Sequence, residues 1–282
     1  MRRKLGIGIM YWASTWNDEQ PPLFAKARAA GFDAVEISLI NGADFDLKAF
    51  RSALDHNGLD VFCIMGLNPQ TDITSPDETI RRAGIEYVKR ALDAARQVGS
   101  PSLCGLPYLQ WLYFPDEDNL QPYRDRCVAA LREIAITASD NGVTLCLEVI
   151  NRFETFMFNT VADALDFLGQ VDHPSVKLHL DTYHMNMEED DMYAAIRQAG
   201  AQLGHFHCVA SNRKLPGADH IDWRAVRAAL DDIGYDGALG IEAFPLPDTK
   251  TGRTVNTWRP LVNDLDADAR AAASFIRREL ID

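Results

Sequence analysis

Short apolar runs alternate with amphipathic stretches along the whole chain. The apolar runs predict strands near residues 5–10, 33–39, 60–65, 102–105, 144–149, 176–180, 203–208 and 238–242. The amphipathic stretches predict helices near residues 20–30, 46–57, 77–98, 121–141, 161–169, 189–199, 223–233 and 265–280. Several runs are almost continuously apolar, as expected for parallel strands that are covered on both faces. This alternation predicts an α/β fold of the (β/α)8 TIM-barrel type, in which all strand C-termini open onto one face.

The helix over 77–98 has the clearest sequence pattern. Ile80, Ala83, Tyr87 and Ala91 recur at helical spacing, and Ser75-Pro76 predicts an N-cap followed by a proline in the first turn. A barrel of this type takes about 250 residues, and no Pro, Gly or Ser-rich linker divides the 282 residues. We therefore expect one domain over 1–282.

Charge and cysteine content exclude several classes of protein. The net charge is −13, and no basic stripe or block is present, so binding to nucleic acid is not expected. No apolar run is long enough to span a membrane, and the apolar N-terminal stretch reads better as a first strand than as a signal peptide. The five cysteines show no CxxC spacing. A cytoplasmic protein with reduced thiols is predicted.

Four polar residues stand at the ends of predicted strands. Glu148, Asp181, His207 and Glu242 each follow an apolar run, about one strand and one helix apart. Strand ends converge on one face of the barrel, and burying an ionised group is costly unless it is paired or coordinated. Three carboxylates and one imidazole suit a divalent ion such as Mn2+, Mg2+ or Co2+. The bland alternatives are a salt bridge from Glu148 to Arg152, and a helix N-cap for Asp181.

Other polar residues near the strand ends have less specific patterns. His205 and His207 face the same side of one strand, and only His207 reaches its end. His205 and His179 are therefore expected as satisfied core histidines. Glu36 is expected as a structural or supporting charge, whereas His184 could contact a substrate oxygen or Asp181. Arg213, on a loop, is equally consistent with a solvated surface arginine.

Aromatic residues cluster on the first and fourth expected loops. An apolar wall beside converging oxygens describes a sugar-sized pocket, but exposed aromatics also form subunit interfaces. We expect both, and hence a homodimer or homotetramer. The residues are Tyr11, Trp12, Trp16, Tyr108, Trp111, Tyr113 and Phe114.

Several blocks resemble one family. The stretches CLEVINRFETFMFNT (146–160), LDTYHMNMEED (180–190) and GHFHCVASNRKLPG (204–217) are similar to the D-tagatose 3-epimerase and D-psicose (allulose) 3-epimerase family of xylose-isomerase-like barrels. The likeness extends from YWASTW (11–16) to GRTVNTWR (252–259). It departs at Ala210 and over 217–223, where the family has a carboxylate and a different loop. That departure bears on which sugar is preferred.

The resemblance implies a metal-dependent isomerase that interconverts the C3 epimers of free ketoses. One divalent ion, Mn2+ first among the three, would be held by Glu148, Asp181, His207 and Glu242. Substrate contacts would come from Glu154, His184, Arg213, Trp111 and Trp16.

Epimerisation at C3 needs one carboxylate to remove a proton and a second to return one from the opposite face, through a cis-enediolate. Glu148 and Glu242 form the symmetric pair. The nearest rival is an aldose–ketose isomerase of the same superfamily, such as a hydroxypyruvate or rhamnose isomerase. A zinc-dependent DNA-repair endonuclease and a sugar-binding protein without catalysis are the more distant alternatives.

Overall fold

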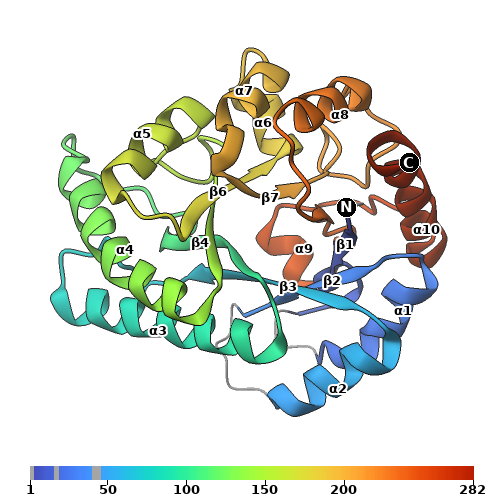
Figure 1. Ribbon diagram of the computed structural model, residues 1–282, viewed down its shortest axis with the longest axis horizontal. Coiled ribbons are helices and arrows are strands. Elements are labelled where there is room, and N and C mark those ends of the chain that lie inside the picture. Colours follow the sequence, from blue (N-terminus) through green and yellow to red (C-terminus); the bar gives the residue numbers. More distant parts are fainter. Residues whose placement is uncertain (1–2, 16–18, 40–45) are drawn as a thin grey trace.

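A closed barrel of eight parallel strands forms the centre of the molecule (Figure 1). The computed structural model describes residues 3–15, 19–39 and 46–282. Each strand pairs with the next in sequence, and β1 pairs with β8 to close the ring. The strands are β1 (Leu5–Gly8), β2 (Ala34–Ser38), β3 (Asp60–Leu67), β4 (Ser102–Gln110), β5 (Thr144–Glu148), β6 (Val176–Asp181), β7 (Leu203–His207) and β8 (Leu239–Ile241). The predicted (β/α)8 barrel is confirmed.

Helices surround the barrel, as Figure 1 shows. The α-helices are α1 (Phe24–Ala29), α2 (Leu47–Asn57), α3 (Glu78–Val98), α4 (Gln121–Asn141), α5 (Val161–Val171), α6 (Thr182–Glu188), α7 (Met192–Ala199), α8 (Trp223–Asp232), α9 (Lys250–Thr254) and α10 (Leu265–Ile276). Short helical turns are η1 (Ile9–Trp12), η2 (Pro21–Leu23), η3 (Gly200–Gln202) and the π-helical η4 (Arg277–Ile281). Among the described helices, none has both the length and the apolar composition that a membrane span requires.

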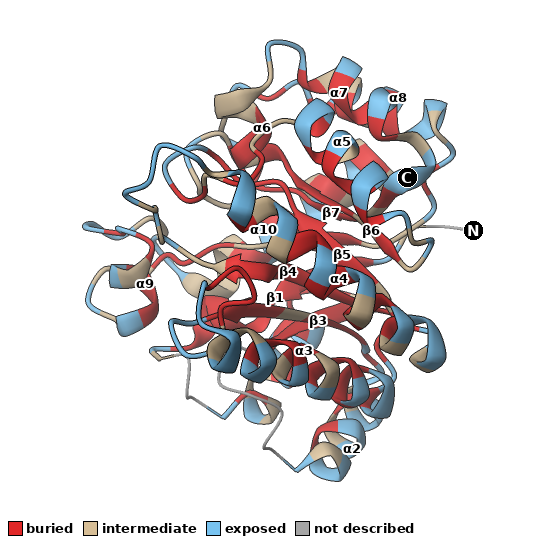
Figure 2. Ribbon diagram, turned by 90° about the vertical axis from the view of Figure 1, so that its left-hand side faces the viewer, coloured by how far each residue is buried: buried red, intermediate tan, exposed pale blue. Residues whose placement is uncertain are grey.

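The core lies in the barrel and between the barrel and its helices. Nearly all strand residues are buried, whereas the outer helices are buried on one side and exposed on the other (Figure 2). Removing this apolar surface from water is the main force that holds the helices against the strands. The barrel therefore presents a rigid ring of strand ends, which is what a precise polar site requires.

Two local predictions about the fold were wrong, and two short helices were missed. Asp77, not Ser75, caps α3, because its side chain accepts a hydrogen bond from the Thr79 N–H. Strand β4 continues to Gln110, so Tyr108 is fully buried in a strand and not in a loop. The short helices α6 and α9 were not predicted.

Gly84 allows α3 to pack closely on the segment between β3 and α3. A Cβ atom at this position would lie 2.2 Å from the Thr71 carbonyl oxygen and 2.8 Å from the Ile73 Cγ2 atom. We expect Gly84→Ala to lower the free energy of unfolding by about 1–3 kcal/mol, because overpacking outweighs the better helix propensity of alanine. Urea denaturation measures the change.

Gly169 in α5 provides the matched control for this substitution. A Cβ atom there would have open space around it, and the residue is exposed in a helix. Gly169→Ala should therefore raise the free energy of unfolding by about 0.5–1 kcal/mol. If both variants changed stability in the same direction, the steric explanation for Gly84 would be wrong.

Candidate active site

The four predicted strand-end residues lie where the sequence placed them. Glu148, Asp181 and His207 are the last residues of β5, β6 and β7, and Glu242 directly follows β8. The strand register sets Asp181 beside His207, and His207 beside Gly240. A Cβ atom on Gly240 would lie 2.6 Å from the His207 Cδ2 atom. The glycine therefore allows the His207 ring to pack close to the backbone of β8.

Among the described residues, three overlapping groups that all contain His207 could hold a metal ion. One consists of His179, His205 and His207 alone. The two that include predicted ligands with carboxylates are Glu148, Asp181 and His207, and Glu36, His207 and Glu242; within each group the candidate ligand atoms lie within 4.8 Å of one another. The four predicted ligands are thus divided between two groups that share His207. Glu36 adds a carboxylate that the predicted ligand set did not contain.

The residues fit a divalent ion in both geometry and chemistry. The His207 Nδ1 atom is buried without a hydrogen-bond partner, and it lies 3.5 Å from the Asp181 Oδ2 atom. An orphaned buried nitrogen is unfavourable unless a ligand satisfies it. Carboxylate oxygens with one imidazole are the donors expected for Mn2+, Mg2+ or Co2+.

The structure excludes the proposed salt bridge of Glu148 to Arg152 but confirms the helix cap by Asp181. Arg152 binds the Glu188 carboxylate at 2.8 Å, so it is not the partner of Glu148. Asp181 does cap α6, because its Oδ1 atom accepts a hydrogen bond of 2.6 Å from the Tyr183 N–H. Its other oxygen faces His207. One side chain therefore both begins a helix and faces the candidate metal site.

Most of the predicted substrate contacts line one cavity of ≈ 110 Å³ at the strand ends. The lining includes Trp111, Glu148, Glu154, His184, Arg213 and Glu242. Trp16 lies outside the described residues. A wider cleft of ≈ 490 Å³ shares Trp111, Glu154 and Arg213 with the cavity and is bordered by α9 and the segment that follows. The cavity and the cleft are therefore adjacent.

His184 presents one defined nitrogen to the cavity. Its Nδ1 atom accepts a hydrogen bond from the Asn151 backbone N–H at 3.2 Å, so the ring proton belongs on Nε2. The Nε2 atom lies 3.8 Å from the Glu148 Oε1 atom. Burial lowers the pKa of His184 to about 4, although Asp181 and Glu154 oppose the shift. The ring is therefore a neutral hydrogen-bond donor beside Glu148.

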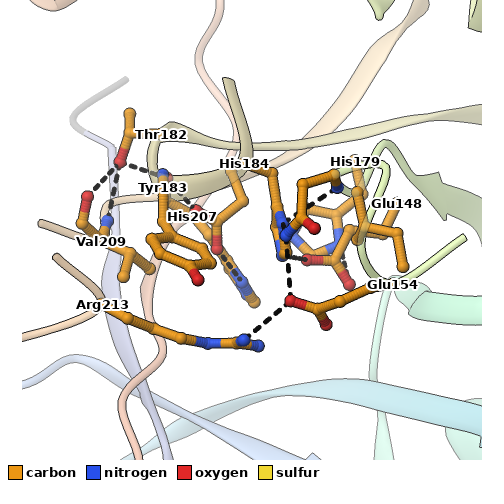
Figure 3. A network of polar contacts seen from close by, with 12 residues as sticks. Glu148, Glu154, His179, Thr182, Tyr183, His184, His207, Val209 and Arg213 are labelled. Atoms are coloured by element: carbon orange, nitrogen blue, oxygen red, sulfur yellow. Dashed lines mark hydrogen bonds and ion pairs between the residues drawn. The ribbon is translucent and has the colours of Figure 1, made fainter. Parts of the chain in front are cut away.

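Glu154 accepts hydrogen bonds from three side chains, and Figure 3 shows it joined to Arg213. Its Oε1 atom accepts hydrogen bonds from Arg213 at 2.8 Å and from Asn151 at 2.9 Å, and its Oε2 atom accepts one from the Trp111 indole at 2.9 Å. Burial is the largest effect and opposes ionisation, but Arg213, His184 and the hydrogen bonds from Asn151 and Trp111 together outweigh it and lower the pKa of Glu154. Without the family resemblance, the sequence leaves Glu154 as a surface loop charge, and it leaves Arg213 open between a site residue and a solvated surface arginine. The structure instead gives a largely buried ion pair.

The loop after β7 holds Arg213 in a strained conformation. Its backbone φ is +60°, which a non-glycine residue adopts at a cost of about 1–3 kcal/mol. The guanidinium lies 4.8 Å from the centre of the Tyr183 ring. His220 ties the loop to α6, since its ring nitrogens lie 3.2 Å from Ser211 Oγ and 2.8 Å from Asn186 Oδ1. The segment that departs from the family pattern therefore braces this loop.

The carboxylates of Glu148 and Glu242 are close enough to interact electrostatically. Burial and the neighbouring Glu242 carboxylate raise the pKa of Glu148 well above its usual range. Burial also raises the pKa of Glu242, to about 7, against the opposing effect of His207. Carboxylates concentrated in a dry cleft are typical of catalytic and metal-binding sites.

Two histidines below the strand ends differ from the prediction. His179 and His205 are buried, as expected. Both ring nitrogens of His179 lack a hydrogen-bond partner, whereas the His205 Nε2 atom makes an ion-pair contact of 3.2 Å with the Glu36 Oε2 atom. Among the residues that the structure describes, all buried side-chain nitrogen or oxygen atoms without a hydrogen-bond partner belong to His179, His205 and His207. The three rings pack edge to face, with centroids 4.1–5.0 Å apart. Such a cluster can be predicted only when the pairing of the strands is known.

The predicted aromatic residues divide into three groups. Tyr11 and Trp111 line the cavity, and Tyr108 is buried behind Glu148, whose carbonyl oxygen accepts the Tyr108 hydroxyl hydrogen bond at 2.7 Å. Trp12 is buried, whereas Phe114 is 46% exposed. The cleft is instead bordered by Phe153 and Trp258, which are 70% and 73% exposed.

A (β/α)8 barrel with several carboxylates around a cavity at its strand ends has the arrangement of a TIM-barrel enzyme, and comparisons with known proteins agree. The family model of the xylose isomerase-like TIM barrel matches residues 24–277. A D-psicose 3-epimerase of Ruminiclostridium cellulolyticum is 34% identical over 283 residues, which cover 97% of each chain. An L-ribulose 3-epimerase of a Methylomonas species is also 34% identical and covers 98% of each chain.

A solved structure leads to the same family. The structure of D-psicose 3-epimerase with D-tagatose from Clostridium cellulolyticum has a TM-score of 0.92 at 33% identity, and the match covers 99% of this chain and 100% of that one. The chain belongs to the ketose 3-epimerases of the xylose isomerase-like TIM-barrel family.

Proposed function

We propose that the protein epimerises free ketohexoses or ketopentoses at C3, with Glu148 and Glu242 as the two groups that move the proton. The observation that carries the proposal is that both carboxylates line one small cavity. They come from the ends of β5 and β8, which lie three strands apart in the ring. Two carboxylates that approach one carbon from different sides are what inversion at that carbon requires.

The remaining cavity residues suit the oxygen atoms of a ketose. The His184 Nε2–H and the Arg213 guanidinium are fixed donors that would stabilise negative charge on O2 as the proton leaves C3. Glu154, held by three donors, is placed to accept a hydrogen bond from the O1 hydroxyl. The network therefore orients the substrate without itself titrating during the reaction.

One divalent ion, Mn2+ before Mg2+ or Co2+, would be held by Glu148, Asp181, His207 and Glu242. When bound, such an ion supplies Lewis-acid stabilisation of negative charge on the substrate oxygens. The orphaned Nδ1 atom of His207 and the cluster of carboxylates support this assignment.

Assembly and location remain predictions of the sequence. The exposed Phe153 and Trp258 beside the cleft support a homodimer or homotetramer, which light scattering in solution would measure. All five cysteines are free and buried, which agrees with a cytoplasmic location.

Incubation of several ketoses in D2O tests the proposed reaction. The metal-stripped protein is supplied with Mn2+, Mg2+ or Co2+ and then with D-fructose, D-tagatose or a ketopentose. We expect deuterium at C3 together with a new ketose, and no product in the absence of an ion. Deuterium at C1 or C2 together with an aldose would instead identify an aldose–ketose isomerase.

A further inference from the structure

Glu36 is a buried carboxylate for which the proposed reaction has no direct use. It lies in the middle of β2, its side chain is 2% exposed, and it forms part of the cavity lining. The register of β1 and β2 sets it beside Gly8. Burying a charge in this way is costly unless it has strong partners.

The partners of Glu36 are two imidazoles of β7. Its Oε2 atom lies 2.9 Å from the His207 Nε2 atom, at hydrogen-bond geometry, and 3.2 Å from the His205 Nε2 atom. An ionised carboxylate only accepts hydrogen bonds, so the His207 Nε2 atom must carry the proton. In a neutral imidazole the lone pair then belongs to Nδ1, which is the orphaned nitrogen that faces Asp181.

We propose that Glu36 is a positioning residue that holds His207 in the orientation and tautomer in which Nδ1 is free to bind the metal ion. Ligating histidines commonly donate their second ring N–H to a carboxylate, which fixes the ring and increases the basicity of the ligand. Without Glu36, the Nδ1–H tautomer would donate to the Asp181 Oδ2 atom, only 3.5 Å away. Two predicted ligands would then bind each other and not the ion.

Glu36 could alternatively be a ligand, because Glu36, His207 and Glu242 also form a possible metal group. The hydrogen bond to His207 argues against this alternative, since the Glu36 Oε2 atom is already directed at Nε2. The two roles predict different losses of metal affinity. Loss of a carboxylate that orients a ligand typically weakens metal affinity about 10–100-fold, whereas loss of a ligand weakens it by more.

Glu36→Gln tests the proposal, with Glu188→Gln as the matched control. Glu188 is a similarly buried side chain, 3% exposed, but it binds Arg152 and not a candidate ligand. Isothermal titration of the metal-stripped proteins with Mn2+ gives their dissociation constants without any sugar present. We expect Glu36→Gln to raise the Kd about 10–100-fold and Glu188→Gln to leave it close to the wild-type value. Circular dichroism checks that each variant is folded.

Four results would overturn the assignment. Unchanged affinity in folded Glu36→Gln would remove the positioning role, and complete loss of binding would make Glu36 a ligand. An equal loss in Glu188→Gln would show a general effect of removing a buried charge. If Glu36→Gln does not fold, Glu36→Asp replaces it; this variant keeps the charge but withdraws the oxygen from Nε2, and unchanged affinity would count against the proposal.

The inference rests on the proposed metal site but not on the sugar chemistry. A wild-type protein that binds Mn2+ without epimerising ketoses would refute only the proposed function. A wild-type protein that binds no divalent ion would refute both.

Discussion

Replacement of Glu148 or Glu242 with glutamine is expected to abolish the interconversion of C3 epimers. Glutamine keeps the shape of the side chain but can neither take nor give the proton, and loss of such a group typically costs about 10²–10⁴-fold in rate. Both residues line the cavity, so neither can replace the other on its own face of the substrate. The turnover number is measured by chromatography of the ketose products at saturating Mn2+.

Glu133→Gln is the control for this substitution. Glu133 lies on the surface of α4, where it binds Arg82 at 2.7 Å and Lys89 at 2.7 Å, and it is not among the residues that line the cavity. We expect full activity from this variant. The assignment of the acid–base pair would fail if a folded Glu148→Gln or Glu242→Gln variant, with Mn2+ bound, kept activity near that of Glu133→Gln.

The metal-type residues could be predicted because each ends an apolar run. In a parallel barrel the end of a strand fixes both the face and the depth of a side chain, so Glu148, Asp181 and His207 needed only the position of three strands. The length of β4 could not be predicted in the same way. Gly105-Leu106-Pro107 reads as a turn, yet the strand passes through it with Gly105 at a φ of +90°.

Contacts between residues that are far apart in the sequence could not be predicted from it. Glu154 and Arg213 lie on the loops after β5 and β7, and nothing local to either residue shows that they form a buried ion pair. The same holds for His205 on β7 and Glu36 on β2, since their separation of 3.2 Å depends on closure of the barrel through the pairing of β1 with β8. The family resemblance placed Glu154 at the substrate, and the structure adds Asn151 and Trp111 as the donors that hold it.

The helix α6 begins at a residue, Asp181, that has two roles. The stretch after Asp181 has no helical spacing of apolar residues and no loop before it, so no helix was predicted there. The Asp181 cap begins α6 directly at the end of β6, which brings His184 back over the cavity one turn later. The helix cap and the functional carboxylate were treated as alternatives. In the structure, the Oδ1 atom of Asp181 caps the helix and its Oδ2 atom faces His207.

This double use makes Asp181→Asn the most informative change to the proposed metal site. Asparagine caps helices about as well as aspartate, so α6 should remain, whereas the negative oxygen that faces His207 is lost. In the wild type, Mn2+ at 100 times its Kd should stabilise the fold by about 2.7 kcal/mol, because the ion binds only the folded state. We expect that stabilisation to vanish in Asp181→Asn at the same Mn2+ concentration, and activity to vanish with it.

Asp181→Ala separates the two roles of the side chain. Alanine removes the cap as well as the ligand, which typically costs about 0.5–2 kcal/mol. Without metal, Asp181→Ala should therefore be less stable than Asp181→Asn by that amount, while Mn2+ should stabilise neither variant. Thermal unfolding of the three proteins with and without Mn2+ measures both differences. If Mn2+ stabilised Asp181→Asn as much as the wild type, Asp181 would be only a helix cap, and the metal ion would have to be held by Glu148, His207 and Glu242 without it.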